Sequence, residues 1–519
     1  MSVSPINVPM SPSSCCRDPR RSDPLAIHHS FQETILSPEG GFLSYAFDTS
    51  VSSPNDPSRW SKSKAFFQLN AVQRVISAIV LAPLVTAFLW LSPAFATSTV
   101  CSFVTSACSY EYAWLSHRIR LRILTRLDAL EGVWNEDSTV SNSSFASEVD
   151  AITSNYSSRS LLRDTSPDLE SRARLQVQRP SQTDLRSRLE EQEQDEIANV
   201  DDQLRPQEAR LNCHAVSELA SLFSNDNDKL AAACLSVVIC AASTTLFLVS
   251  VEHAQALQST EFYKSRWFYA IATSFVAAFC ACLAPDWQYA FTVLVQYGVF
   301  TVLTMYSTGC PLNNFSCGIG LEPEVAFLVG MLTLLICRLT ACKSGVEAFL
   351  SFMLDVLGLF YISGTLSVLV AFVDDERKVL YRELLIALLY IVWASDTGAY
   401  ITGKALKWVQ YPYYNPLAAH ISKNKDYEGT VGAIAFGIGT MAAVSKALDL
   451  PGSFGSKVLL TVVAVITGRI GDLFESLLKR AAGVKDSGKL IPGHGGMLDR
   501  IDALMFATLI FSRYFNVGA

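Results

Sequence analysis

The sequence is short of charge. Asp, Glu, Lys and Arg make up 17% of its 519 residues, whereas soluble domains contain about 25%. Hydrophobic residues make up 50%, and the mean hydropathy is +0.27. This composition excludes an ordinary soluble protein of this length and indicates a polytopic membrane protein with polar additions. A basic domain is also lacking and the formal net charge is -7, so we expect no nucleic-acid partner.

The 13 cysteines lack the spacing of a metal site or of a disulfide framework. Many lie inside apolar runs, such as Cys234 and Cys240, where they are expected to be small buried hydrophobic residues. Cys310 and Cys317 lie in a predicted loop, and a disulfide between them stays an open alternative. The sequence also shows no internal repeat, so a transporter built from inverted repeats gains no support.

The first 126 residues divide into two parts. Residues 1–65 are rich in Ser, Pro and Arg, lack an apolar segment of the signal-peptide type, and are predicted to be disordered. Several acidic residues weaken a transit-peptide interpretation, so plastid or mitochondrial targeting stays a hypothesis. Residues 66–126 are predicted to form a transmembrane hairpin with spans at 75–91 and 93–115. Basic residues flank both outer ends, which places these ends on the cytosolic or equivalent side.

The rest of the chain consists of a polar insertion and a long apolar region. Residues 127–228 are Ser-rich and charged, and we expect a largely disordered insertion with one short helix. Residues 229–519 are predicted to be a transmembrane domain, because apolar segments of about twenty residues recur along it. These segments lie near 230–250, 268–284, 287–306, 323–341, 350–373, 383–403, 431–448, 456–473 and 503–516. The predicted fold class is all-α, a polytopic membrane protein with about nine to eleven transmembrane helices.

Charge returns in one stretch between long apolar segments, from Gly471 to Asp502. Its first half is predicted to be a helix that ends at Gly483. Four polar residues fall at i, i+3, i+4 and i+7 and therefore share one face of this helix: Asp472, Glu475, Ser476 and Lys479. A loop rich in Gly follows, whose backbone can approach a ligand closely and which contains His494.

The final apolar helix is predicted to open with Asp499 and Asp502, one turn apart on the same side. Carboxylates at the ends of two helices, with Lys, Arg and His between them, fit metal-assisted phosphate chemistry. Oxygen ligands hold Mg²⁺, and cations neutralise the remaining phosphate oxygens. The alternative is a juxtamembrane loop in which Lys and Arg side chains reach the interface and acids cap helices. That alternative does not require the Gly-His-Gly-Gly sequence of the loop.

Two other polar segments interrupt the apolar region. The first reads ASDTGAYITG from Ala394, and it places Asp396, Tyr400 and Lys404 on one helical face. An acid within a membrane span is costly and is a candidate functional residue, although an Asp that packs two helices together is the simpler alternative. The second segment, Ser422–Gly429, reads SKNKDYEG and adds two lysines.

The stretch Gly471–Asp502 resembles the signature of the phosphatidate cytidylyltransferases, the CDP-diacylglycerol synthases, in its bacterial and plastid-like form. The signature positions are filled by Ser476, Lys479, Arg480, Lys485, Asp486, Pro492, His494, Gly495, Gly496, Asp499, Arg500 and Asp502. The segment around Asp396 is similar to the Ser-Asp-Thr-Gly-Ala-Tyr segment of the family. The family also has Ser-Pro-Lys-Lys-Thr-x-Glu-Gly, which Ser422–Gly429 matches at four positions, whereas Lys423, Asn424 and Asp426 depart from it.

This resemblance implies transfer of the cytidylyl group of CTP to phosphatidic acid, giving CDP-diacylglycerol and pyrophosphate, with Mg²⁺ as cofactor. The attacking phosphate monoester is largely ionised at neutral pH, so positioning and charge neutralisation are expected to dominate catalysis. The expected metal ligands are Asp472 and Asp499. The expected catalytic residues are Asp396, Lys479, Arg480, Lys485, His494, Arg500 and Asp502. The expected substrate-binding residues are Ser422, Lys425, Glu428, Ser476, Gly495 and Gly496.

The same resemblance implies contact with membrane lipids, a homodimer by analogy, and residence in an organelle membrane, plastid-like or mitochondrial, or in the endoplasmic reticulum. Three alternatives stay open. A CTP-dependent lipid kinase acting on polyprenol or phytol would release CDP in place of pyrophosphate. A cation-coupled transporter would move ions without CTP turnover, and an inactive relative would serve as a scaffold.

Overall fold

The structure, a computed structural model, describes residues 86–87, 90, 93–139, 182–205, 214–223, 227–254, 258, 261–309, 322–371, 378–411, 413, 415–488, 490 and 495–513. Nearly all of them belong to one compact unit, Ser92–Ala519. Most of the predicted first span, 75–91, lies outside the described residues, as does the whole of the predicted disordered region, 1–65.

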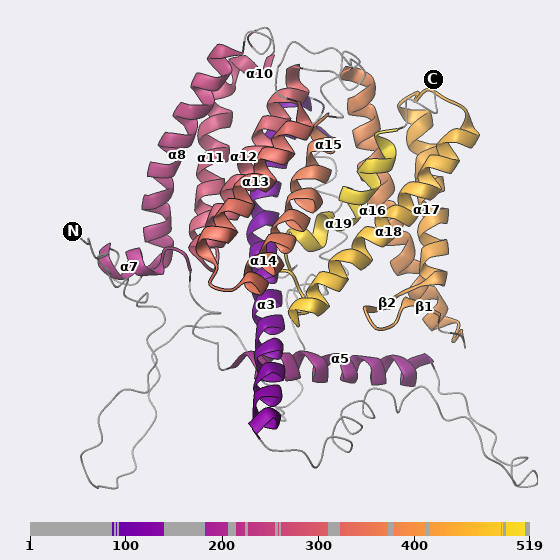
Figure 1. Cartoon of the computed structure of the whole chain (residues 1–519). Coiled ribbons are helices and arrows are strands. Elements are labelled where there is room, and N and C mark those ends of the chain that lie inside the picture. The colour runs from indigo at the N-terminus through magenta and orange to yellow at the C-terminus, as the bar shows by residue number, and fades with distance from the viewer. Residues whose placement is uncertain are drawn as a thin grey trace, which may run out of the picture. The chain divides into compact units, whose positions relative to one another are not determined.

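The described part of this unit is a bundle of helices with one short hairpin at its end (Figure 1). The helices are α3 (Pro93–Thr139), α5 (Gln182–Leu204), α7 (Ser217–Phe223), α8 (Asp228–His253), α10 (Glu261–Lys264), α11 (Arg266–Cys282), α12 (Trp287–Gly309), α13 (Pro323–Ala341), α14 (Gly345–Gly358), the π-helix η3 (Leu359–Gly364), α15 (Thr365–Ala371), α16 (Lys378–Trp408), α17 (Tyr427–Ala447), α18 (Phe454–Ala482) and α19 (Leu498–Phe511). Strands β1 (Pro416–Ala418) and β2 (Ser422–Asp426) pair antiparallel.

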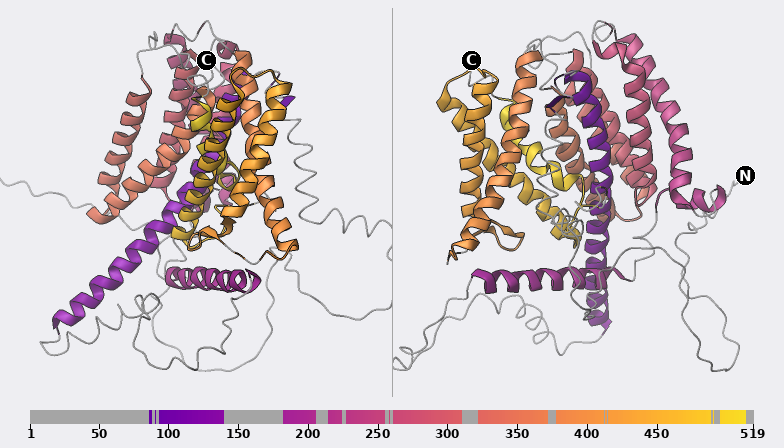
Figure 2. Two further views of the ribbon diagram at one scale, coloured as in Figure 1. Left: turned by 90° about the vertical axis from the view of Figure 1, so that its right-hand side faces the viewer. Right: turned by 180° about the vertical axis from the view of Figure 1, so that it is seen from behind.

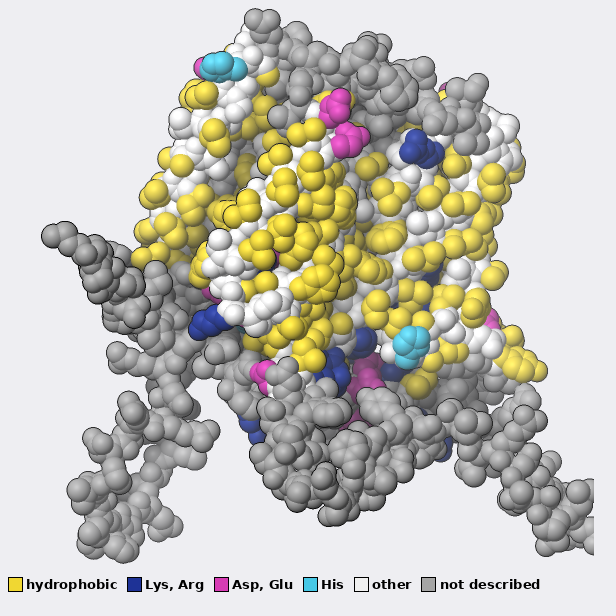
Figure 3. Space-filling view, in the orientation of Figure 1, with side chains coloured by type: hydrophobic (Ala, Val, Ile, Leu, Met, Phe, Trp, Pro, Cys, Tyr) yellow, Lys and Arg dark blue, Asp and Glu magenta, His cyan; other side chains and the backbone are white. Residues whose placement is uncertain are grey.

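Six of the described segments are helical, long and apolar enough to cross a membrane, with α14, η3 and α15 counted as one. Many of their large apolar side chains point outward, among them Leu246 and Leu339. Figure 3 shows hydrophobic side chains spread over one face of the bundle, with a group of charged side chains toward its lower end. The all-α class and the integral membrane character are thus confirmed, and the nine predicted apolar segments each correspond to a helical segment. The total of nine to eleven spans stays a prediction.

Helix α3 differs from the expected span at 93–115, because it continues without a break to Thr139. The added turns contain many Arg and Leu residues, which favour helix. This part of α3 extends beyond the bundle. Helix α5 lies across the same end of the bundle in all three ribbon views (Figures 1 and 2). Leu121 of α3 packs against Val200 and Leu204 of α5. The prediction of one short helix in residues 127–228 therefore underestimates the helical content of this segment, since α5 alone has 23 residues.

A close approach between α18 and α19 shapes the polar end of the bundle. A Cβ atom added to Gly471 would lie 2.7 Å from the carbonyl oxygen of Asp502 and 2.7 Å from the Phe506 ring. A side chain at position 471 would therefore push the two helices apart. This contact brings Asp472 of α18 beside Asp502 of α19, as the sequence predicts for the two charged helix ends. Gly483 ends α18 in the left-handed conformation (φ 69°), which confirms the predicted stop.

We expect Gly471→Ala to lower the stability of the detergent-solubilised protein by about 1–3 kcal/mol, because the added methyl group overpacks a tight contact. Thermal unfolding followed by fluorescence would measure the change. Gly455→Ala in the same helix is the matched control, since a Cβ atom there meets nothing within 4 Å. Equal melting temperatures for the two variants would contradict the close contact of α18 and α19.

Candidate active site

The predicted polar segments meet at one cavity of about 530 Å³ at the end of the bundle. Asp396, Tyr400 and Lys404 line it from one face of α16, which confirms the predicted spacing. The other charged residues of the lining come from β2, α18, α19 and the outer end of α16: Lys407, Lys425, Asp426, Arg469, Asp472, Asp499 and Asp502. Segments that lie up to 106 positions apart in the sequence therefore contribute to one polar space.

Lys425 enters this space from β2 and binds α18. Its Nζ atom lies 2.5 Å from Asp472 Oδ1 and donates to the Ser476 hydroxyl at 2.8 Å and to the Asp472 carbonyl oxygen at 2.5 Å. Arg469 Nη1 lies 3.6 Å from the other Asp472 carboxylate oxygen. The structure therefore joins Lys425 and Ser476, both predicted to bind substrate, to Asp472, which is predicted to bind a metal.

Lys479 lies one turn further along α18 and joins two acids. Its Nζ atom is 2.5 Å from Glu475 Oε2 and 2.6 Å from Asp499 Oδ1. The second Asp499 oxygen accepts hydrogen bonds from the backbone N–H groups of Ser487 (3.1 Å) and Gly496 (3.0 Å). Asp499 thus fixes the start of α19 and the end of the Gly-rich loop to α18.

Three carboxylates form a group that could hold a metal ion: Asp472, Glu475 and Asp502, with one oxygen from each within 4.8 Å of the others. Carboxylates this close repel one another unless a cation or a proton lies between them. An all-oxygen set of this size fits Mg²⁺. Asp472 was predicted as a ligand and Asp502 as a catalytic residue, whereas Glu475 was placed on the polar face without a role. Asp499, the other predicted ligand, pairs with Lys479 next to this group.

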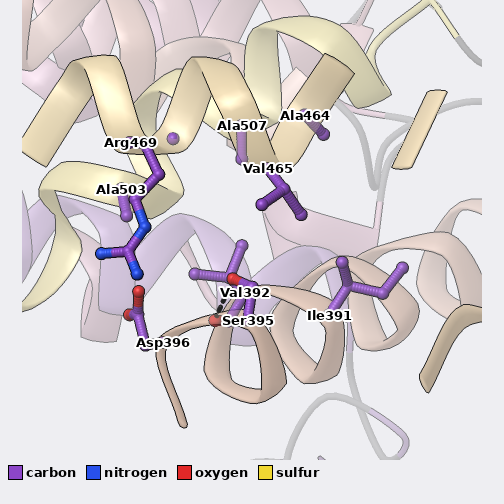
Figure 4. Close-up of a pocket in the computed structure, with 10 residues that line it drawn as sticks. Ile391, Val392, Ser395, Asp396, Ala464, Val465, Arg469, Ala503 and Ala507 are labelled. Carbon is purple, nitrogen blue, oxygen red and sulfur yellow. Dashed lines mark hydrogen bonds between the residues drawn. The ribbon is translucent and has the colours of Figure 1, made fainter. Parts of the chain in front are cut away.

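Asp396 lies across the cavity from α18. Figure 4 shows the Arg469 side chain extending from α18 toward the Asp396 carboxylate on α16. Arg469 also approaches Asp472, so this guanidinium lies between the acid of α16 and the group of three carboxylates. Sequence reasoning did not select Arg469, although its position three residues before Asp472 places it on the same helical face.

The remaining predicted residues that the structure describes are not among those that line the cavity. Arg480 donates from Nε to the Ile421 carbonyl oxygen (3.2 Å). Glu428 accepts a 2.7 Å hydrogen bond from Asn415 Nδ2 and so fastens the β-hairpin to α17. Ser422 pairs with Ala418 at the start of β2. The side chains of Lys485 and Arg500 are exposed, Gly495 has a φ of 83°, and His494 lies outside the described residues.

Glu111 of α3 also belongs to this site, although sequence reasoning assigned no role to it. Its Oε1 accepts from Met497 N and its Oε2 from Leu498 N, both at 2.9 Å, and Oε2 also accepts from the Ser487 hydroxyl at 3.2 Å. These backbone N–H groups belong to the start of α19, where helical partners are missing, and a carboxylate also complements the helix dipole. An acid within an otherwise apolar segment was the signal that could have identified it.

Helix α3 also binds the end of α18. Arg122 Nη1 donates to the carbonyl oxygens of Arg480 and Ala481, both at 2.9 Å, and Arg118 Nε donates to that of Ala482 at 3.1 Å. These are the carbonyl groups that a helix end leaves without partners. The loop between α18 and α19 is therefore attached to α3 at both ends.

We expect Glu111→Ala to lower nucleotide turnover at least tenfold and to cost about 1–3 kcal/mol of stability, because two buried N–H groups lose their acceptor. Glu111→Gln keeps one acceptor oxygen and should fall between the wild type and Glu111→Ala. Turnover and melting temperature would be measured together, with the exposed Glu324→Gln as the control. Wild-type turnover in Glu111→Ala would show that the start of α19 is positioned without this carboxylate.

Comparisons with known proteins agree with this geometry. The model of the Cytidylyltransferase family matches residues 231–517. A phosphatidate cytidylyltransferase of Brucella suis is 38% identical over 126 residues, which is 24% of this chain and 44% of the relative. A phosphatidate cytidylyltransferase of Staphylococcus epidermidis is 43% identical over 133 residues, which is 25% of this chain and 48% of the relative. One of Bacillus subtilis is 39% identical over 116 residues, which is 22% of this chain and 41% of the relative.

The chain spans less than half the length of these curated relatives. The family match is longer: it covers more than half of the chain and includes α16, β2, α18 and α19, which line the cavity. The carboxylates and lysines of the cavity thus lie on the matched segment. The protein belongs to the cytidylyltransferase family.

Proposed function

We propose that this protein transfers the cytidylyl group of CTP to phosphatidic acid, giving CDP-diacylglycerol and pyrophosphate. The observation that carries the proposal is the meeting of Asp472, Glu475 and Asp502 with Lys425 and Lys479 at one polar cavity in an apolar helical bundle. Family membership and relatives named phosphatidate cytidylyltransferase support it.

In this reaction a phosphate oxygen of phosphatidate attacks the α-phosphorus of CTP, and the bond to the bridging oxygen of the β-phosphate breaks. The nucleophile has a second pKa of about 6, so most of it is already ionised at neutral pH. The residues of the cavity therefore need to bring two polyanions together and to neutralise them. Lys425 and Lys479 are positioned for this neutralisation, since each ammonium group lies within 2.8 Å of oxygen atoms at the cavity.

We propose Mg²⁺ as the cofactor, held by Asp472, Glu475 and Asp502. When bound there, it would supply positive charge to the phosphate oxygens. In our proposal Asp499 positions Lys479 and the Gly-rich loop, because both of its oxygens already accept from those two elements. Asp396 of α16 and Arg469 of α18 line the same cavity, and the cytidine monophosphate part of the donor would be oriented beside them.

The position of the cavity suits a lipid substrate. Tyr400 lines it, and the neighbouring Ile401 is an exposed apolar residue of the membrane-spanning part of α16. A phosphatidate headgroup could therefore reach the carboxylates and lysines while its acyl chains stay beside apolar protein surface. This arrangement avoids moving the acyl chains into water, which would cost about 0.8 kcal/mol for each CH₂ group.

We also propose, from the resemblance of the signature, a homodimer in an organelle membrane, plastid-like or mitochondrial, or in the endoplasmic reticulum. A reporter fused to the first seventy residues would test targeting. Uptake of the reporter by plastids or mitochondria would support the organelle, and a reporter left in the cytosol would count against an N-terminal targeting signal.

The reaction is tested with purified protein, phosphatidic acid, α-labelled CTP and Mg²⁺. We expect label in the lipid fraction together with pyrophosphate, and a loss of at least about 100-fold in Asp472→Asn, because that variant removes charge from the metal group. Glu324→Gln is the matched acid-to-amide control. CDP release without labelled lipid, seen with polyprenol or phytol, would indicate a lipid kinase. Absence of any nucleotide turnover would leave the transporter and scaffold alternatives.

A second measurement separates metal binding from positioning. We expect the Mg²⁺ concentration for half-maximal turnover to rise at least about tenfold in Glu475→Gln, because one of three oxygen ligands loses its charge. Asp499→Asn should lower the maximal turnover and leave this Mg²⁺ concentration within about twofold, since Asp499 acts through Lys479 and the loop. The opposite pattern would return Asp499 to the metal site.

A further inference from the structure

Helix α5 lies across the end of the bundle, next to β2 and to the end of α18 (Figures 1 and 2). It belongs to the polar insertion and lies outside residues 231–517, the part that the family model matches. Contacts near its C-terminal end attach it to α3 and α18. Asp201 lies 2.6 Å from Arg118 of α3, and Val200 packs against Gly483, where α18 ends.

Glu193 of α5 binds two cations from different elements of the catalytic domain. Its Oε2 lies 2.8 Å from Lys423 Nζ of β2, and its Oε1 contacts the Arg480 guanidinium of α18. Burial acts to raise the pKa of Glu193, but the hydrogen bond from Lys423 and the charges of Arg480, Lys423 and Lys485 lower it below its ordinary value. Glu193 is therefore an anion held by cations of the catalytic domain.

These two cations lie next to residues of the candidate active site on both β2 and α18. Lys423 and Lys425 lie two positions apart on β2, so both point to the same face of the strand. On α18, Arg480 lies one turn after Ser476, which binds Lys425. The Lys423–Arg480 pair is thus displaced from the Lys425 site by about 6 Å, the length of two strand residues or one helical turn. A polyphosphate chain bound near Lys425 could extend over this distance.

We propose that Lys423 and Arg480 form a polyphosphate subsite, and that the Glu193 carboxylate of α5 occupies this subsite until a polyphosphate displaces it. The proposal rests on the proposed function and concerns the end of the donor distant from cytidine. The ligand class is a phosphoanhydride, either the terminal phosphates of CTP or the pyrophosphate product. Glu193 competes with that ligand. The apparent affinity for the ligand is therefore the intrinsic affinity of the open subsite multiplied by the fraction of protein in which the subsite is open.

The sequence of this segment fits the proposal. Lys423 stands where the family pattern Ser-Pro-Lys-Lys-Thr has Pro, and Asn424 stands where it has the first Lys. The lysine at 423 lies on the same face of β2 as Lys425, and its ammonium group meets the Arg480 guanidinium at the Glu193 carboxylate. A single carboxylate carries less charge than pyrophosphate and can be replaced by it, because pyrophosphate can engage both cations with several oxygens.

The experiment compares Glu193→Gln with the matched control Glu191→Gln, an exposed acid on the same helix. Calorimetry of the full-length purified protein would measure binding of inorganic pyrophosphate with Mg²⁺, and kinetics would give KM for CTP. We expect Glu193→Gln to bind pyrophosphate at least about fivefold more tightly than the control and to lower KM for CTP, with kcat changed less than about twofold. Lys423→Ala should weaken pyrophosphate binding about fivefold or more.

Equal or weaker pyrophosphate binding in Glu193→Gln, with an unchanged melting temperature, would overturn the proposal and leave Glu193 as a structural tether of α5. If that variant fails to fold, Asp201→Asn provides the second test, because it loosens α5 at its exposed contact with Arg118 and should also tighten pyrophosphate binding. Binding is measured without lipid or turnover. A protein that makes no CDP-diacylglycerol but shows the predicted shift would therefore refute the proposed function and retain the subsite.

To separate the two phosphoanhydrides, CTP and pyrophosphate are titrated in parallel. Tighter binding of both in Glu193→Gln supports a subsite used by donor and product, and tighter binding of pyrophosphate alone restricts it to the product. Tighter binding of CTP alone would contradict a subsite for the terminal phosphates, since these groups are chemically the same in both ligands.

Discussion

The polar end of this protein depends on the mutual neutralisation of buried lysines and carboxylates. Lys425 and Lys479 each bind acids at distances of 2.5–2.6 Å, and all of these groups lie on helices or a strand that join a largely apolar bundle. Removing ions of either sign from water is costly, so each lysine and its partners are stable there only together. The same pairing keeps the carboxylates of α18 and α19 close enough to offer a cation several oxygens.

Pairing of this kind also prepares the cavity for an anionic substrate. A lysine that binds Asp472 or Asp499 is held in place, and it can turn part of its hydrogen bonding toward a phosphate without entering from solvent. Catalysis by fixed charges has its advantage in such surroundings, because the groups need little rearrangement during the reaction. The close contact of α18 and α19 at Gly471 sets the distances on which this depends.

Sequence patterns predicted correctly those features that depend only on residues close together in the sequence. The helical spacing of Asp472, Glu475 and Lys479 and the stop at Gly483 are confirmed, because both follow from local geometry. The partners of these residues could not be read in the same way. Whether Asp499 faces a metal or Lys479 depends on how α19 is placed against α18, and the sequence contains no direct measure of that placement. The partners of Glu111 and Glu193 could not be predicted for the same reason, since each residue meets them across more than 200 positions of the chain.

Helix α3 carries an acid to the positive end of α19 and two arginines to the negative end of α18. The dipoles of α18 and α19 are thus both complemented by side chains of one continuous helix. That helix lies wholly outside the segment that the family model matches. Residues 231–517 accordingly hold the reactive side chains but not the support that keeps their connecting loop in place. Without α3, this segment would lack the groups that hold both ends of its connecting loop, so the structural unit that supports the cavity begins at least as early as Glu111.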